Sequence, residues 1–156
     1  QWSWGSLMLG RPMLGQRVTD LLALITALRN HTGLNGMPLS IAARGQLTVP
    51  ALCAALLDNS VGALHLSEGL VSFRSIVETL EYRHPFSNFV PGMLLHTDLP
   101  QLAASLSGQK VTMAGTVDGS GKTLKVSKVE QIYAETKNLT ILPDSSWDLE
   151  TLSHVV

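Results

Sequence analysis

Residues 43–47, Ala-Arg-Gly-Gln-Leu, lie between a short apolar run at 38–43 and a longer one at 47–58 that has the composition of a helix. A strand, a tight turn and a helix form the setting in which the pattern G-x-S-x-G raises a serine Oγ above a sheet to attack an acyl group. The serine position of that pattern is Gly45. Because glycine has no reactive side chain, the sequence predicts the turn of a nucleophilic site without its nucleophile.

Glycine at this turn also has a conformational explanation. The turn drives its central residue toward positive φ, which glycine adopts without the steric penalty that other residues pay. Arg44, next to it, either faces solvent as an ordinary turn residue or holds an anion at the N-terminus of the following helix. The solvent-facing role is the simpler interpretation.

A second segment with chemical potential is 115–123, Gly-Thr-Val-Asp-Gly-Ser-Gly-Lys-Thr, which lies between a predicted strand and a predicted helix. A phosphate-binding loop has four residues between its first glycine and Gly-Lys-Thr. This segment has five, which would misplace the backbone N–H groups that surround the phosphates. A flexible turn is favoured, and a nucleotide-binding module is kept only as an outside alternative.

The elements that would position these residues follow from hydropathy patterns and turn signals. The predicted order is a helix at 13–30, strand 38–43, helix 47–58, strand 61–66, helices 72–80 and 99–106, strand 110–115, helix 125–136, strand 139–142 and a closing helix at 147–154. The aromatic and proline-rich residues 82–91 read as an irregular excursion. Strands alternating with helices predict an α/β fold with a mainly parallel sheet, right-handed crossovers and both sheet faces covered.

Composition is consistent with one soluble globular domain over residues 1–156, since 45% of residues are hydrophobic and 15% are charged. A net charge of -1 with scattered basic residues argues against a nucleic-acid surface. No apolar run reaches the roughly 20 residues of a membrane span. The single Cys53 is read as an inert buried thiol, and the isolated histidines show no metal-ligand spacing.

Three phrases now point to a family. Residues 6–18, SLMLGRPMLGQRV, resemble the stretch preceding the nucleophile strand in acetyl xylan esterase-like α/β-hydrolases, including bacterial members. Residues 96–102, HTDLPQL, and the strand-end phrase 117–119, VDG, are similar to the same family. The resemblance runs across nearly the whole chain and covers the second half of a hydrolase domain. It implies a domain incomplete at its N-terminal side, and a periplasmic or secreted location.

The resemblance assigns positions to a catalytic triad, which needs a nucleophile, a histidine and a carboxylate. The nucleophile position is Gly45, and the backbone N–H of Gln46 would supply one oxyanion donor. Asp118 maps to the acid, although Asp-Gly is also a strong turn signal and both roles stay open. The histidine should lie after the fourth strand, and residues 143–147 contain none. His154 follows on the predicted closing helix, where a surface or packing role is favoured.

We therefore expect a catalytically degenerate esterase-like domain with a structural, assembly or ligand-binding role, which is not an enzyme by itself and needs no cofactor. The alternative is a carbohydrate-ester (acetyl ester) or related acyl hydrolase that uses a noncanonical site with Asp118. An upstream segment, a second chain or self-association would complete the sheet, and a carbohydrate ester is a possible ligand. Nucleic acid and membrane are not expected as partners.

Overall fold

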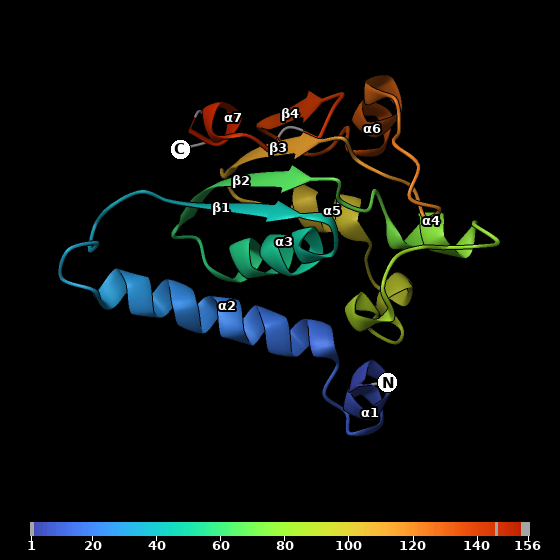
Figure 1. The fold of residues 1–156 in the computed structure, drawn as a ribbon, viewed down its shortest axis with the longest axis horizontal. Coiled ribbons are helices and arrows are strands. Elements are labelled where there is room, and N and C mark those ends of the chain that lie inside the picture. Colours follow the sequence, from blue (N-terminus) through green and yellow to red (C-terminus); the bar gives the residue numbers. More distant parts are fainter. Residues whose placement is uncertain (1, 146, 154–156) are drawn as a thin grey trace.

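The computed structural model describes residues 2–145 and 147–153. These form a four-stranded sheet with flanking helices (Figure 1). The elements in chain order are α1 (Trp2–Met8), α2 (Met13–Asn30), β1 (Leu39–Arg44), η1 (Gly45–Leu47), α3 (Thr48–Leu57), β2 (Val61–Ser67), α4 (Phe73–Val77), η2 (Phe86–Asn88), η3 (Met93–Leu95), α5 (Leu99–Ala104), β3 (Lys110–Ala114), α6 (Val126–Ile132), β4 (Leu139–Leu142) and α7 (Leu149–Ser153), where η marks a 3₁₀ helix.

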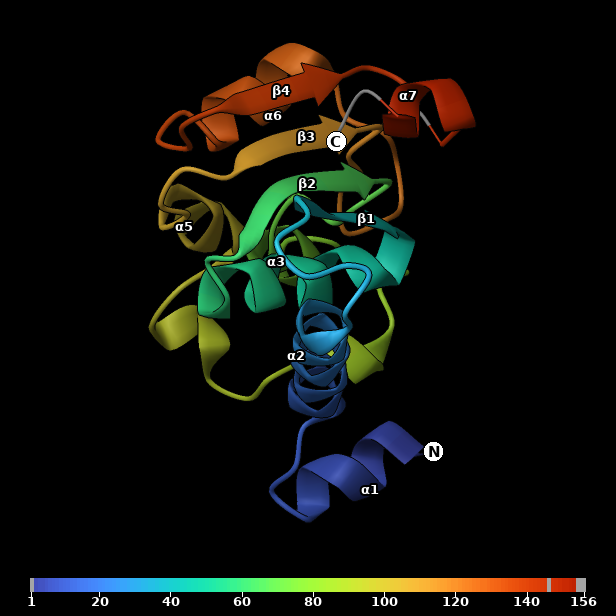
Figure 2. The same cartoon turned by 90° about the vertical axis from the view of Figure 1, so that its left-hand side faces the viewer.

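The sheet is entirely parallel and its strands lie in sequence order, β1-β2-β3-β4. The predicted α/β fold with a parallel sheet is confirmed. Each connection moves to the next strand in the same direction, so crossovers of one hand bring the connecting helices to the same face. Figure 2 shows α3, α5 and α6 together on one side of the sheet.

The opposite face of the sheet, which was also predicted to be covered, is covered only in part. After β4 the chain turns back over this face and leads into α7 (Figures 1 and 2). The ring of Trp147 in this returning segment lies 6.1 Å from that of His65. His65 of β2 is fully buried. The segment after β4 therefore lies over the middle of this face, while Ala42 of β1 and Thr140 of β4, which share the face with His65, are exposed.

The hydrophobic core lies between the sheet and α3, α5 and α6. Alternate residues of the two central strands face it, among them Leu64 and Leu66 of β2 and Val111 and Met113 of β3, and all four are buried. Strand side chains alternate between faces, so His65 and Ser67 project from the other side. Both are buried, which makes β2 an interior strand on both of its faces.

Helix α2 has the predicted bounds and packs beside α3. Leu14, Val18 and Ile25 are its buried residues, and they recur at helical spacing. Near its C-terminus the Arg29 guanidinium donates to the carbonyl oxygens of Met37 and Ser60 at 3.1 and 2.6 Å. The helix is thereby fixed to the connections that lead into β1 and β2.

Several helices differ from the predicted lengths. Helix α4 ends at Val77 rather than residue 80, and α6 ends at Ile132 rather than residue 136. Tyr133, directly after α6, is buried and its hydroxyl donates to the Val71 carbonyl at 2.7 Å. The hydrogen bond between Tyr133 and Val71 therefore lies where α6 ends. Within the described residues α7 covers 149–153; the predicted closing helix also included residue 154, which lies outside the described residues.

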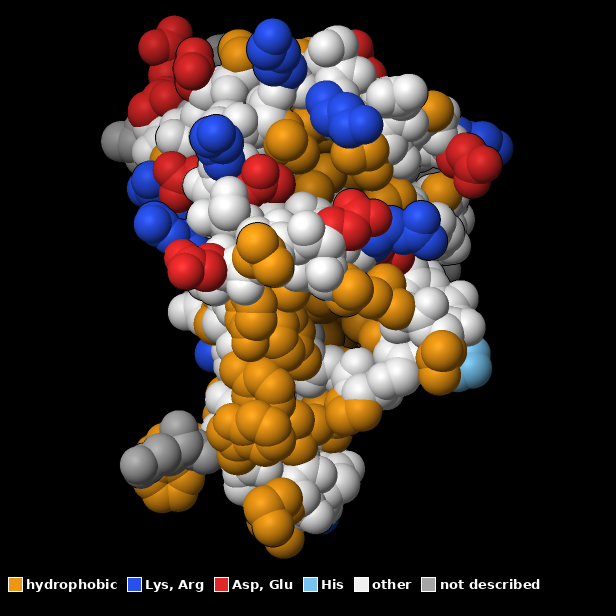
Figure 3. Space-filling model, turned by 90° about the vertical axis from the view of Figure 1, so that its right-hand side faces the viewer, with side chains coloured by type: hydrophobic (Ala, Val, Ile, Leu, Met, Phe, Trp, Pro, Cys, Tyr) orange, Lys and Arg blue, Asp and Glu red, His pale blue; other side chains and the backbone are white. Residues whose placement is uncertain are grey.

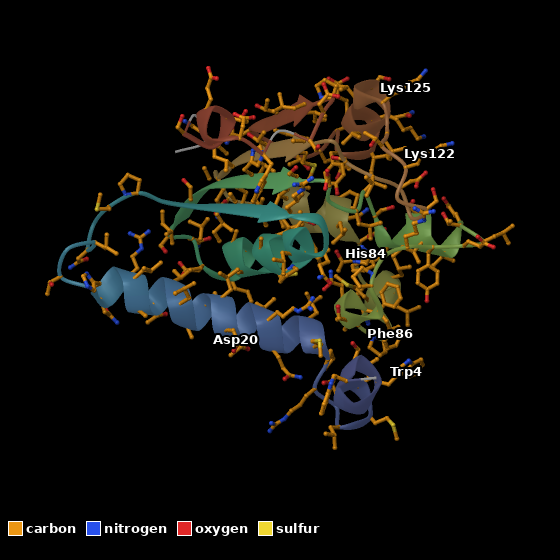
Figure 4. All side chains as sticks on the ribbon, viewed as in Figure 1. Trp4, Asp20, His84, Phe86, Lys122 and Lys125 are labelled. Atoms are coloured by element: carbon orange, nitrogen blue, oxygen red, sulfur yellow. The ribbon has the colours of Figure 1, made fainter. Side chains whose placement is uncertain are left out.

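Helix α1 is an element that the sequence reasoning missed. Its Trp4 stacks on Phe86 of η2 with ring centroids 4.4 Å apart, and Figure 4 shows the two side by side. Trp2, Met8 and the following Leu9 are strongly exposed. The helix is also linked to α2 through a Gln16–Ser6 side-chain hydrogen bond at 3.4 Å, while Trp2 and Met8 face outward.

No helix among the described residues is both long enough and apolar enough to cross a bilayer.

Candidate functional site

Three neighbouring strands leave the sheet through the same unusual backbone conformation. Gly45, Glu68 and Gly115 directly follow β1, β2 and β3, with φ angles of +57°, +51° and +57°. Positive φ is uncommon for a residue other than glycine and raises its conformational energy. The carboxyl edge of a parallel sheet is also where α/β proteins place ligands. The candidate site is therefore this edge of the sheet.

The elbow after β1 has the geometry that the sequence predicts. Gly45 adopts the expected positive φ, and the chain passes through η1 into α3. The Thr48 hydroxyl donates to the Gly45 carbonyl at 2.8 Å, which closes the turn. Apart from Gly45 and its two chain neighbours, no atom of the described residues lies within 4 Å of where a Cβ on Gly45 would stand. The position at which the sequence pattern predicts a nucleophile therefore has room for a side chain but carries none.

Arg44 is occupied by a carboxylate from the next strand end. Its Nε and a terminal guanidinium nitrogen each donate to a different oxygen of Glu68, both at 2.8 Å. Hydrogen bonding to Arg44 lowers the pKa of Glu68, and a further hydrogen bond from Ser145 acts in the same direction. Glu68 therefore joins the ends of β1, β2 and β4. The Arg44 guanidinium is neutralised by this partner, which weakens it as a holder of external anions.

A polar network behind the elbow was not foreseen from sequence. The side-chain nitrogen of the fully buried Asn88 donates to the Gln46 carbonyl at 2.6 Å and lies 3.1 Å from His84 Nε2. Arg17 of α2 donates to the Asn88 amide oxygen at 3.1 Å and to the Ser87 hydroxyl at the same distance. The network fixes the peptide between Gln46 and Leu47, one residue beyond Gly45. Its members are up to 71 residues apart, so no local pattern could have found it.

His84 in this network is held neutral. Burial lowers its pKa to about 4, because an imidazolium loses hydration there. Its ring lies edge-on to Phe73, with centroids 6.2 Å apart. Figure 4 shows His84 above Phe86, on the side of the molecule where the strands end. With Asn88 as donor, Nε2 acts as the acceptor, and His84 serves as a structural partner of the amide.

Asp118 lies in a tight hairpin turn. Its Oδ1 accepts from the backbone N–H groups of Ser120 and Lys122 and from the Ser120 hydroxyl, at 2.9, 3.0 and 2.7 Å. Burial raises the pKa of this carboxyl, but the hydrogen bonds from Ser120 and Lys122 outweigh it and the net pKa is lowered. The same contacts use N–H groups that a phosphate-binding loop would direct at its ligand. The arrangement is that of a turn aspartate.

The Asp118 turn is anchored to α4. The Gly119 N–H donates to the Ser75 hydroxyl at 2.7 Å, and the Arg83 N–H donates to the Gly119 carbonyl at 2.9 Å. Of the residues singled out from sequence, Arg44, Gly45 and Gln46 therefore share the elbow, while the Asp118 carboxylate accepts its hydrogen bonds from its own turn. Glu68, His84 and Asn88 are the additional residues at the strand ends.

The arrangement provides hydrogen-bonding and charged groups but no triad at the elbow. Residues 143–145, 147 and 148 after β4 contain no histidine. In the part of the chain that the structure describes, no group of three or more His, Cys, Asp or Glu side chains could hold a metal ion. Cys53 is partly buried in α3, and burial raises the pKa of its thiol, which disfavours the reactive thiolate.

No protein-family model matches this chain, and no curated protein matches its sequence.

Proposed function

We propose that this chain forms the second half of an acetyl xylan esterase-like α/β-hydrolase domain that has lost triad chemistry and serves as a binding or assembly module. The observation that carries the proposal is Gly45. It occupies the nucleophile position of a strand, left-handed turn and helix, with φ at +57° and open space around it. A site that needs a serine Oγ and a histidine for acyl transfer has neither at the expected places.

The sheet supports this proposal. Parallel strands in sequence order, each ending on the same edge, provide the framework that the second half of such a fold would need. Glu68 and Arg44 occupy that edge as an ion pair, and Asn88 holds the elbow peptide. These contacts stabilise the loops without arranging a proton relay.

The edge of β1 supports an assembly role. Among the described strands β1 pairs with β2 alone, and its Leu39 and Ile41 are only half-buried. An unpaired strand edge offers backbone donors and acceptors to another strand. We propose that an upstream segment, a second chain or self-association extends the sheet here. A periplasmic or secreted location belongs to the same proposal and rests on the family resemblance.

Hydrolysis of 4-nitrophenyl acetate tests the loss of catalysis. Initial rates are compared for the wild-type chain, Asp118→Ala and heat-denatured protein at equal concentration. We expect the same slow background rate from all three, because the elbow has no nucleophile. A wild-type rate well above the denatured control that disappears in Asp118→Ala would overturn the proposal and favour the carbohydrate-ester or related acyl hydrolase.

A further inference from the structure

An apolar groove opens between α4 and the segment that contains η3. Its walls include Phe73, Ile76 and Val77 on one side and Phe89, Met93 and Leu95 on the other, and its volume is about 250 Å³. Val77 and Leu95 are 74% and 83% exposed. Figure 3 faces the end of the molecule that carries α4 in Figure 1 and shows apolar side chains gathered there.

The volume and lining of the groove indicate what it could hold. An apolar cavity of about 150 Å³ holds benzene, which has six carbons, so a groove of 250 Å³ has room for a chain of roughly eight to ten carbons. Phenylalanine rings form firm walls, while the flexible Met93 side chain can adapt to an aliphatic chain. Covering Val77 and Leu95 would remove exposed apolar surface from water, which favours binding.

A polar cleft adjoins this groove. It has a volume of about 610 Å³, and Leu94 and Leu95 line both depressions. Its charged side chains are of both signs: the cations are Arg74 and Lys128, and the anions are Glu78, Asp98 and Asp118. Because the signs are nearly balanced, the cleft has no strong preference for an anion or a cation.

Two carboxylates of the cleft already accept hydrogen bonds from the protein. Asp98 caps α5 through the Leu99 N–H at 2.7 Å and also accepts from the N–H groups of Phe73 and Arg74 at 2.7 and 3.1 Å. Asp118 is occupied by its own turn. What the cleft offers a ligand is therefore an assortment of hydrogen-bonding groups, which suits an uncharged head with several hydroxyls.

We propose that the groove and the cleft form one site for an amphiphile with a single medium-length aliphatic chain and an uncharged, hydroxyl-rich head. The chain lies in the groove, the head lies in the cleft, and Leu94 and Leu95 line the boundary. This deepens the ligand-binding role in the proposed function, on which it rests, by naming the class of ligand.

Isothermal titration calorimetry with octyl β-glucoside, kept below its micelle concentration, tests the site on the whole chain. We expect saturable binding that methyl β-glucoside, which lacks the chain, does not reproduce. Octanoate and octyltrimethylammonium should each bind about tenfold more weakly, because the cleft does not favour a charged head. Equal or tighter binding of either ion would overturn the assignment of the head. The glucoside has no ester bond, so its binding is independent of any result with 4-nitrophenyl acetate.

Two surface variants locate the site. Leu95→Asp places a charge on the boundary of the groove, and Leu57→Asp makes the same change at the end of α3, where Leu57 is 69% exposed. We expect about tenfold weaker octyl glucoside binding in Leu95→Asp, comparable to losing an apolar contact, and unchanged binding in Leu57→Asp. Equal binding by both variants would overturn the proposal. A titration without saturation would also overturn the proposal. Sedimentation of the ligand-free chain shows whether dimers cover the groove, and heat that comes from dissociation of such dimers would overturn the proposal too.

Discussion

Arg44 and Glu68 form a two-point ion pair between the carboxyl ends of β1 and β2, with both nitrogen–oxygen distances at 2.8 Å. Glu68 makes this pair from a backbone with φ at +51°. The contact therefore combines a favourable charge interaction with an unfavourable backbone conformation. It also keeps the elbow arginine beside a carboxylate.

Two substitutions at Glu68 separate these contributions. Glu68→Gln removes the ion pair and keeps the strained backbone, so it should lower the free energy of unfolding at pH 7 by less than about 1 kcal/mol, as for other exposed pairs. Glu68→Gly also removes the pair but relieves the positive φ, so it should be about 1 kcal/mol more stable than Glu68→Gln. Urea unfolding measures both, and the reverse order would contradict the strain argument.

The Glu68 pair also has a predicted pH dependence. Arg44 lowers the pKa of Glu68 below its ordinary value of 4.5. The stability from the pair is therefore fully present above about pH 4.5 and is lost as the pH falls through the lower pKa of the folded state. The stability difference between wild type and Glu68→Gln should shrink in urea titrations at acidic pH. A constant difference would show that ionisation of Glu68 does not contribute.

Gly45→Ser should restore the residue type of a nucleophile without restoring catalysis. A serine Cβ would meet no neighbour within 4 Å, but positive φ should cost about 1 to 2 kcal/mol of stability. Hydrolysis of 4-nitrophenyl acetate should stay at the background rate, since residues 143–145, 147 and 148 provide no histidine. Gly36 also has a positive φ and open space at its Cβ position, and it lies away from the elbow. Gly36→Ser is therefore the matched control for stability. Faster hydrolysis by Gly45→Ser alone would mean that another base reaches this position.

His84 should make the protein less stable as the pH falls from about 6.5 toward 4. Burial lowers its pKa from 6.5 to about 4 in the folded state, so the unfolded chain binds a proton first in this interval. Urea midpoints at pH 7 and pH 5 should therefore differ more for wild type than for His84→Gln, whose side chain can still accept from Asn88 but does not titrate. Equal differences in the two proteins would place the titration elsewhere.

Gly119 and Gly15 should respond in opposite directions to alanine. A Cβ on Gly119 would lie 2.5 Å from the Ser75 carbonyl oxygen, a backbone atom, so Gly119→Ala should lower the free energy of unfolding by more than about 2 kcal/mol. Gly15 lies on an exposed position of α2 with nothing within 4 Å, and Gly15→Ala should raise it by about 1 kcal/mol. Chemical denaturation of both variants checks the close packing of the Asp118 turn on α4.

Local patterns predicted most of the elements. The helix at 13–30 and the strand at 139–142 have the predicted bounds, and Gly45 has the predicted positive φ. These features depend on side-chain periodicity and on the conformational freedom of one residue, which are properties of short segments. The α/β class follows from the alternation of such segments. None of the residues of α1 is buried. The helix was missed because its bounds therefore depend little on side-chain periodicity.

Tertiary structure decided which polar residues meet. Glu68 reaches Arg44 because parallel pairing aligns the ends of β1 and β2, and Asn88 reaches Gln46 because the excursion folds back on the elbow. The sequence by itself determined that the elbow has no serine and that the loop after β4 has no histidine before residue 154. It could indicate a turn at Asp118 through the Asp-Gly pair, but it could not anchor that turn on α4 or put a groove beside α4. Those features come from packing between segments far apart in the chain, where distance in space is independent of spacing in sequence.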